Sequence, residues 1–206
     1  MDDQRLRLKR RLQEFQLERL KGTYEDFLAG SPYESLCGFF TTHLYNAQDF
    51  TARNESFKKL VHAFESAFGT EVLHSISLLL DVHDLSERLD DDVVEQFVKM
   101  GVGLDFDMAA YERAYFVADK YPERVRQIEM LVDAVHIVHR IAFFPFIGFL
   151  LKTLYAGALM IGATPMVQFL QDGYDAFRTV KDPTPFTKAI HDREMERLDR
   201  IYGVKK

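Results

Sequence analysis

The chain has 206 residues, of which 47% are hydrophobic and 28% charged, and its formal net charge is −6. This length and balance indicate one globular domain over 1–206 and exclude a disordered, collagen-like or low-complexity chain. The acidic excess argues against a dedicated nucleic-acid binder, and the single cysteine, Cys37, excludes an internal disulfide framework and a multi-thiolate zinc site. The charged N-terminus carries no export-signal pattern, so we expect a reducing, cytoplasmic location.

Apolar residues recur at three- and four-residue steps through nearly the whole chain, which is the period of an amphipathic α-helix. The first half of the chain therefore predicts four helices. They cover 3–28, 32–45, a segment from Asn54 or Ser56 to 68, and 72–89 with Thr70 as N-cap.

An acidic run, Asp90-Asp91-Asp92, precedes apolar residues at helical spacing. Acidic side chains are favoured at a helix N-terminus, where they accept hydrogen bonds from free N–H groups and complement the helix dipole. We therefore predict that a new helix begins at this run and ends at Gly101. A cation site is the alternative interpretation, but no calcium-loop spacing accompanies the run.

The second half of the chain continues the helical pattern. The predicted helices run from a cap at Asp105 or Asp107 to 117, over 121–143, over 166–180 and over 186–202, with two short helices between 141 and 163. No segment shows sustained two-residue alternation, so we predict no strand. The predicted fold class is all-α: an irregular multi-helix bundle of roughly nine or ten helices.

The most apolar region lies between Arg140 and Asp172, where Lys152 is the only charged residue. A membrane-spanning helix needs about 20 apolar residues, and here it would place Lys152 in the bilayer and include Pro145. We therefore expect a helical pair buried in the bundle, with peripheral membrane contact through 141–163 as an alternative.

Two interpretations of Lys152 remain open. In the simpler one, its stem lies along the bundle and its ammonium group reaches water. In the other, helices 145–162 and 164–180 enclose an apolar pocket, in which Lys152 and Arg140 hold the head group of an anionic amphiphile.

Candidate catalytic and metal-binding residues are few. No nucleophile elbow, phosphate-binding loop, dinucleotide fingerprint or zinc-protease motif is present, so enzymatic activity is undetermined and we expect no cofactor. Acid-x-x-His pairs end at His74 and His136, and His139 lies three residues further on, which is the helical spacing of some metal or haem sites. We favour structural roles for these histidines, and a buried, unreactive Cys37.

Residues 39–45 read Phe-Phe-Thr-Thr-His-Leu-Tyr, and Asp49, Phe50 and Arg53 follow. This pattern resembles the uncharacterised bacterial FFLEELY-motif proteins, with Thr-Thr-His in place of the central Leu-Glu-Glu. The resemblance implies a helical bacterial protein and no particular activity. The residues that match are Phe39, Phe40, Leu44, Tyr45, Asp49, Phe50 and Arg53.

The motif also has a physical interpretation. On a helix Phe40 and Leu44 share one face, which Phe39 extends, and Tyr45 can bury its ring while its hydroxyl stays hydrogen-bonded. Asp49 and Arg53 can pair across the following loop. We therefore predict a structural role rather than a ligand site.

These observations favour a non-catalytic binding or interaction module. Its partner would be a small apolar ligand or another protein, and not a nucleic acid. A metal- or haem-dependent helical enzyme and a peripheral membrane protein are the alternatives.

Overall fold

The computed structural model describes residues 3–44, 70–149, 151–152 and 164–204. The all-α prediction is confirmed: these residues form nine helical elements and no strand. The elements are α1 (Asp3–Thr23), α2 (Glu25–Leu28), α3 (Glu34–Phe39), the π-helix η1 (Phe40–Leu44), α5 (Thr70–Met100), α6 (Met108–Val117), α7 (Tyr121–Ala142), α9 (Thr164–Arg178) and α10 (Thr184–Tyr202).

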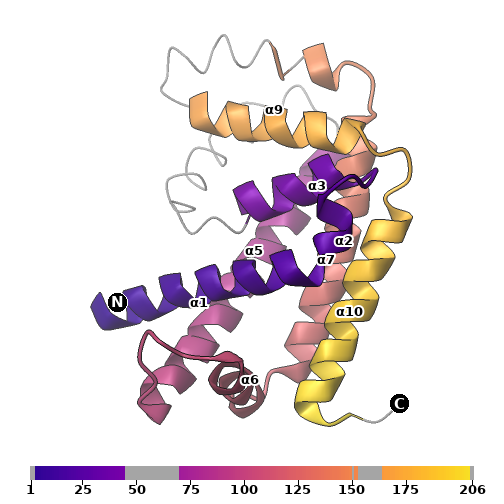
Figure 1. The fold of residues 1–206 in the computed structure, drawn as a ribbon. Helices are drawn as coiled ribbons and strands as arrows, with labels where there is room; N and C mark the ends of the chain where they lie inside the picture. Colours follow the sequence, from indigo (N-terminus) through magenta and orange to yellow (C-terminus); the bar gives the residue numbers. More distant parts are fainter. Residues whose placement is uncertain (1–2, 45–69, 150, 153–163, 205–206) are drawn as a thin grey trace.

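Helix α7 packs against α5 and α10, and α1 crosses α5 (Figure 1). Helix α9 lies against α3, at the end of the bundle where α7 terminates (Figure 1). Helix α6 closes the opposite end, between α5 and α10. The exit of α7 and the start of α9 thus lie at the same end of the molecule.

Two clusters of buried side chains form the core. One centres on Leu12, Phe97 and Tyr111, and the other on Leu36 and Phe177. Helices α1, α7 and α10 supply residues to both clusters, so the same three helices connect the two halves of the bundle. The single-domain organisation inferred from chain length remains a prediction.

Several predicted boundaries agree with the structure. Asp107 caps α6, accepting a hydrogen bond of 2.8 Å from the backbone N–H of Ala110. Helix α7 begins at Tyr121-Pro122, as expected for a proline in a first turn. The predicted helix over 3–28 is instead interrupted at Tyr24, and the one over 32–45 changes to π-helix at Phe40. The helix predicted to end at 68 lies outside the described residues.

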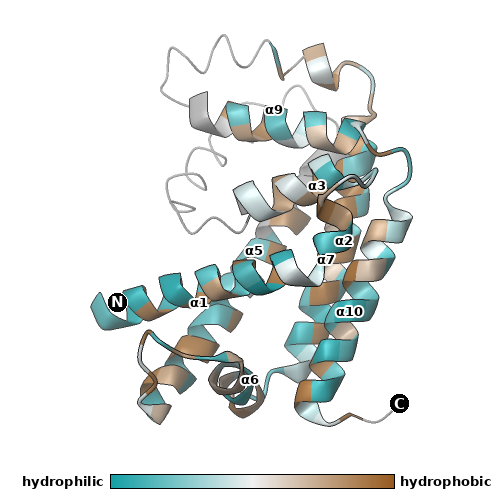
Figure 2. Ribbon diagram, in the orientation of Figure 1, coloured by the Kyte–Doolittle hydropathy of each residue, from teal (hydrophilic) through white to brown (hydrophobic). Residues whose placement is uncertain are grey.

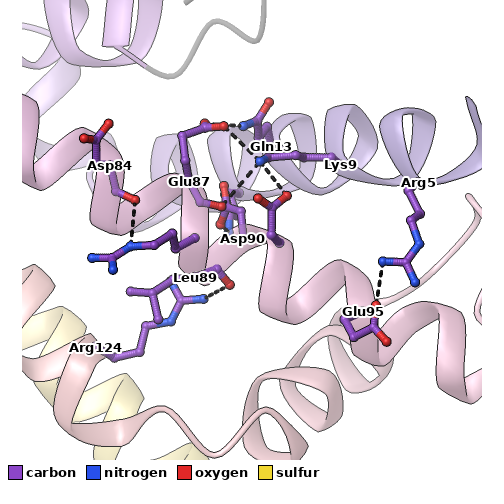
Figure 3. A network of polar contacts seen from close by, with 12 residues as sticks. Arg5, Lys9, Gln13, Asp84, Glu87, Leu89, Asp90, Glu95 and Arg124 are labelled. Carbon is purple, nitrogen blue, oxygen red and sulfur yellow. Dashed lines mark hydrogen bonds and ion pairs between the residues drawn. The ribbon is translucent and has the colours of Figure 1, made fainter. Parts of the chain in front are cut away.

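The prediction that Asp90-Asp91-Asp92 begins a new helix was wrong. Helix α5 runs without interruption over 31 residues, and the acidic run lies in its interior. The carboxylates of Asp90 and Asp91 have partners on α1 instead of on local N–H groups (Figure 3). Local spacing could not show this, because the partners lie more than 70 residues earlier in the chain, on α1.

A buried lysine on α1 meets this run. The Nζ atom of Lys9 lies 2.6 Å from an Asp91 carboxylate oxygen and 2.9 Å from one of Glu87 (Figure 3). Burial opposes the charge of Lys9, but its hydrogen bonds to Asp91 and Glu87 outweigh this effect and raise its pKa. Lys9 is therefore charged, and its ion pairs with Glu87 and Asp91 fix the position of α1 on α5.

Asp90 is buried beside this contact. It accepts a hydrogen bond of 3.0 Å from the side-chain amide of Gln16. Burial raises the pKa of Asp90, although Arg124 and Gln16 both oppose the rise. The folded protein therefore favours the protonated form of Asp90 more than the unfolded chain does.

We predict that Asp90→Asn stabilises the protein at pH 7.5. The asparagine oxygen can still accept from Gln16, and no buried charge remains. Because the pKa of Asp90 is raised in the folded state, the wild type loses stability as pH rises from the ordinary carboxyl range through this raised pKa. Asp90→Asn does not titrate, so its advantage over the wild type should be largest at pH 7.5 and shrink as pH falls toward that range. A gain of about 1 kcal/mol would raise Tm by about 2–4 °C, measurable by circular dichroism.

Asp91→Asn is the matched control. It removes a charge from the neighbouring residue but leaves the buried ammonium group of Lys9 with one carboxylate partner fewer, so it should lower Tm. A lower Tm for Asp90→Asn at pH 7.5 would instead show that Arg124 stabilises an ionised Asp90.

Candidate functional site

Two of the residues predicted from the FFLEELY resemblance, Phe39 and Phe40, lie at the junction of α3, η1 and α9. The centroids of the Phe39 and Phe169 rings are 5.3 Å apart, and those of the Phe40 and Phe186 rings are 5.8 Å apart. Both rings are partly buried and pack against the second core cluster. Leu44 ends η1, whereas Tyr45, Asp49, Phe50 and Arg53 lie outside the described residues.

Phe39 also explains a glycine in α9. A Cβ atom at Gly173 would lie 2.9 Å from Cζ of the Phe39 ring. Real side chains do not approach so closely, so the missing side chain allows the ring to lie directly on the helix backbone. The contacts of Phe39 and Phe40 are those of packing residues.

Two of the candidate histidines make structural hydrogen bonds. The Nε2 atom of His136 lies 3.0 Å from the Thr187 hydroxyl, and that of His139 lies 2.8 Å from the carbonyl oxygen of Val180. The His74 side chain is outside the described part of the structure. Among the side chains that the structure describes, no three His, Cys, Asp or Glu residues are grouped as metal ligands would be.

The cysteine is buried, as predicted. Cys37 is 2% exposed, and its burial raises the pKa of the thiol to about 11. The thiol is therefore protonated at neutral pH and is a poor nucleophile.

The described surface includes the following two open hollows. The larger, about 550 Å³, is lined mainly by charged residues of α5 and α7, including Asp81, Glu87 and Arg126. The other, about 350 Å³, lies between α3 and α9 and includes Phe39 and Asp175. Neither is lined by Lys152 or Arg140. The predicted amphiphile pocket would involve residues 153–163, which are outside the described residues, so it remains a prediction.

The most unusual surface lies where α7 ends. The chain leaves α7 as a strongly hydrophobic segment (Figure 2). It contains four phenylalanines within seven residues, and these are exposed by 44–83%. We call them the phenylalanine surface: Phe143, Phe144, Phe146 and Phe149. The expectation that this apolar region is buried was wrong for these four rings.

The phenylalanine surface belongs to a segment that is anchored to the bundle. Ile147 and Leu151 are only 7% and 8% exposed, and their four-residue spacing places them on one helical face. Beside them, a Cβ atom at Gly148 would lie 2.6 Å from the Tyr174 hydroxyl of α9, which shows how closely the two segments approach. The rings are therefore exposed on a segment that is itself packed.

The backbone leaves the helical conformation where the phenylalanine surface begins. The N–H of Phe144 bonds the carbonyl of Ile141 at 2.9 Å, which closes the last turn of α7. Pro145 follows, and Phe146 adopts φ +69°, in the left-handed region that a bulky side chain rarely occupies. Phe146 is also the most exposed of the four rings, at 83%.

Cationic side chains accompany the phenylalanine surface. The Arg178 guanidinium carbon, at the end of α9, lies 4.7 Å from the centre of the Phe143 ring. Arg140 precedes the surface by three residues and Lys152 follows it by three, and both are exposed. The two residues predicted to hold an anionic head group therefore lie at either end of the exposed rings.

The pattern Phe-Phe-Pro-Phe-Ile-Gly-Phe contained a signal for this surface. A proline in third place, among closely spaced aromatic residues, indicates a turn instead of a continuous buried helix. Hydropathy alone could not separate the rings that point outward from Ile147 and Leu151. No helix among the described residues is long and apolar enough to cross a membrane.

Fold and surface together define an all-α protein with an exposed aromatic surface at one end of its bundle. The chain belongs to the family described as domain of unknown function (DUF8198), whose model matches residues 1–206. No curated protein and no solved structure gives a significant match to the chain.

We predict that Gly173→Ala destabilises the fold. The new methyl group would displace the Phe39 ring, at a cost of about 1–3 kcal/mol, which exceeds the gain of up to about 1 kcal/mol in helix propensity. Thermal unfolding followed by circular dichroism should show a lower Tm.

Gly38→Ala is the matched control, because it also lies in a helix and a Cβ there meets nothing within 4 Å. It should be neutral or stabilising by about 0.5–1 kcal/mol. If both variants had the same Tm, the Phe39 contact would contribute nothing to stability.

Proposed function

We propose that this protein is a non-catalytic binding protein that docks peripherally on a lipid bilayer through its phenylalanine surface. Of the functions considered from the sequence, the exposed rings favour this one. The main support for this proposal is the conformation of Phe146, which is 83% exposed and has a left-handed backbone conformation.

Folding stability does not account for this arrangement. A non-glycine residue in the left-handed region costs on the order of 1–3 kcal/mol, and an exposed ring recovers little of it by burial. Contiguous exposed apolar side chains on a soluble surface usually mark a contact site. A strained residue that holds a ring in solvent is consistent with selection for contact outside the chain.

The shape of the surface favours a bilayer over a protein partner. A side chain that is 83% exposed has solvent on almost every side, so Phe146 lies at a protruding tip. Lipid deforms around such a tip, whereas a protein would need a matching apolar socket.

Some finer expectations belong to this proposal. We place the protein in the cytoplasm, where a buried, unpaired cysteine is in keeping with reducing conditions. We also retain the resemblance to the bacterial FFLEELY-motif proteins, which rests on residues 39–53. The family match supports the coarser statement, that the chain belongs to an uncharacterised family.

Vesicle co-sedimentation tests the function. We expect the full chain to bind vesicles of phosphatidylcholine and phosphatidylglycerol, and Phe144→Ser/Phe146→Ser to bind at least tenfold more weakly. Full burial of one phenylalanine ring contributes about 1.5–3 kcal/mol, and 1.4 kcal/mol corresponds to a factor of ten. Both rings are already exposed, so the variant should retain its Tm.

Phe116→Ser is the matched control. Phe116 is 53% exposed on α6, at the opposite end of the bundle, and its loss should leave vesicle binding unchanged. Failure of the wild type to bind any vesicle would contradict the proposal. A concentration-dependent dimer abolished by Phe144→Ser/Phe146→Ser would assign the surface to contact between copies instead.

A further inference from the structure

The charges around the phenylalanine surface carry a further inference, which rests on the proposed function. We infer that the bilayer it binds is anionic, and that Arg140, Lys152 and Arg178 contact lipid phosphates and acidic head groups while the rings enter the apolar layer.

The sequence is locally cationic although the whole chain is acidic. The formal net charge is −6, yet residues 134–152 contain Arg140 and Lys152 and no acidic residue. Arg178 adds a third cation from α9, beside Phe143. Residues 134–152 and Arg178 therefore carry charge of the opposite sign to the net charge of the protein.

The three cations lie on different elements but accompany the same rings. Arg140 is exposed in the last turn of α7, three residues before Phe143, and Lys152 is exposed three residues after Phe149. Three-residue spacing on a helix places side chains on neighbouring positions of one face. Each end of the phenylalanine surface is thus accompanied by a positive charge.

The charged group of Arg178 lies directly against one of the exposed rings, that of Phe143. Its guanidinium carbon lies 4.7 Å above the Phe143 ring and 5.9 Å from the Tyr174 ring. Stacking on aromatic faces orients the planar guanidinium and leaves its edge free to donate paired hydrogen bonds to phosphate oxygens. This arrangement suits a residue at the level of the head groups, with the Phe143 ring beneath it.

Acidic residues on α9 are accounted for elsewhere. Asp172 and Asp175 accept hydrogen bonds from Gln168 and Gln171 and line the hollow that α9 forms with α3. The following turn contains Asp182, which accepts a hydrogen bond from the backbone N–H of Thr184. These carboxylates belong to contacts other than those of Phe143.

Vesicles of two compositions test the inference. One set of vesicles is pure phosphatidylcholine and the other also contains about 30 mol% phosphatidylglycerol. We expect the wild type to bind the anionic vesicles at least tenfold more tightly, because each cation near an anionic surface adds to the attraction. This preference should shrink several-fold on going from about 0.1 M to about 0.5 M NaCl, because salt screens charges at a surface.

Arg140→Gln/Lys152→Gln should remove most of the preference for anionic vesicles and leave binding to neutral vesicles unchanged. Arg10→Gln/Arg113→Gln is the matched control, since it changes the net charge equally at exposed positions on α1 and α6. The control should keep the wild-type preference. If it lost the preference to the same extent, overall charge would be responsible and the inference would be overturned.

The outcomes separate this inference from the proposed function. Equal binding to neutral and anionic vesicles, still weakened by Phe144→Ser/Phe146→Ser, would overturn the anionic preference and leave the docking function standing. No binding to either composition would overturn both. Unchanged Tm values for the Gln variants would show that any loss arises at the surface and not from unfolding.

Discussion

Helix α7 packs against α5 and α10 at once, and polar contacts at both of its ends hold it in place. Near its start, the Arg124 guanidinium donates a hydrogen bond of 2.9 Å to the carbonyl oxygen of Leu89 on α5 and lies 4.1 Å from the Tyr115 ring. Near its end, His136 contacts the Thr187 hydroxyl of α10. Because both ends are held, α7 has one direction of exit, and that exit carries residues 143–149 to the surface. The position of the phenylalanine surface follows from this packing.

The contact between α1 and α5 depends on a different balance. Lys9 and Asp90 are buried in the interface, where desolvation opposes both charges; the carboxylates of Glu87 and Asp91 outweigh this effect for Lys9, whereas the partners of Asp90 only reduce it. A shift of α1 by one turn would leave Lys9 without its carboxylates. Such contacts add little net stability compared with apolar packing, but they disfavour alternative registers. The acidic run therefore serves the arrangement of helices and not the start of one.

Close packing and exposure occur side by side at the end of the bundle that carries α9. Phe39 lies on the backbone of Gly173, and Tyr174 approaches Gly148, so α9 is held tightly on both sides. The same region presents Phe146 to solvent in a strained conformation. A rigid support makes an exposed ring effective for contact, because little conformational entropy is lost when the ring is buried by a partner. The close packing of α9 and the exposure of Phe146 together support the proposed docking function.

Local sequence determined the helical fold, the cap at Asp107 and the start of α7 at Tyr121-Pro122, because apolar period, capping and proline effects act within a few residues. It also singled out Arg140, which borders the apolar region, and Lys152, the only charged residue within it. Tertiary structure alone decided that Asp90 lies inside α5 and that Phe143, Phe144, Phe146 and Phe149 point outward while Ile147 and Leu151 point inward. Hydropathy does not distinguish a buried phenylalanine from an exposed one; that depends on whether a distant helix covers the position, and here α9 covers only one side of the segment.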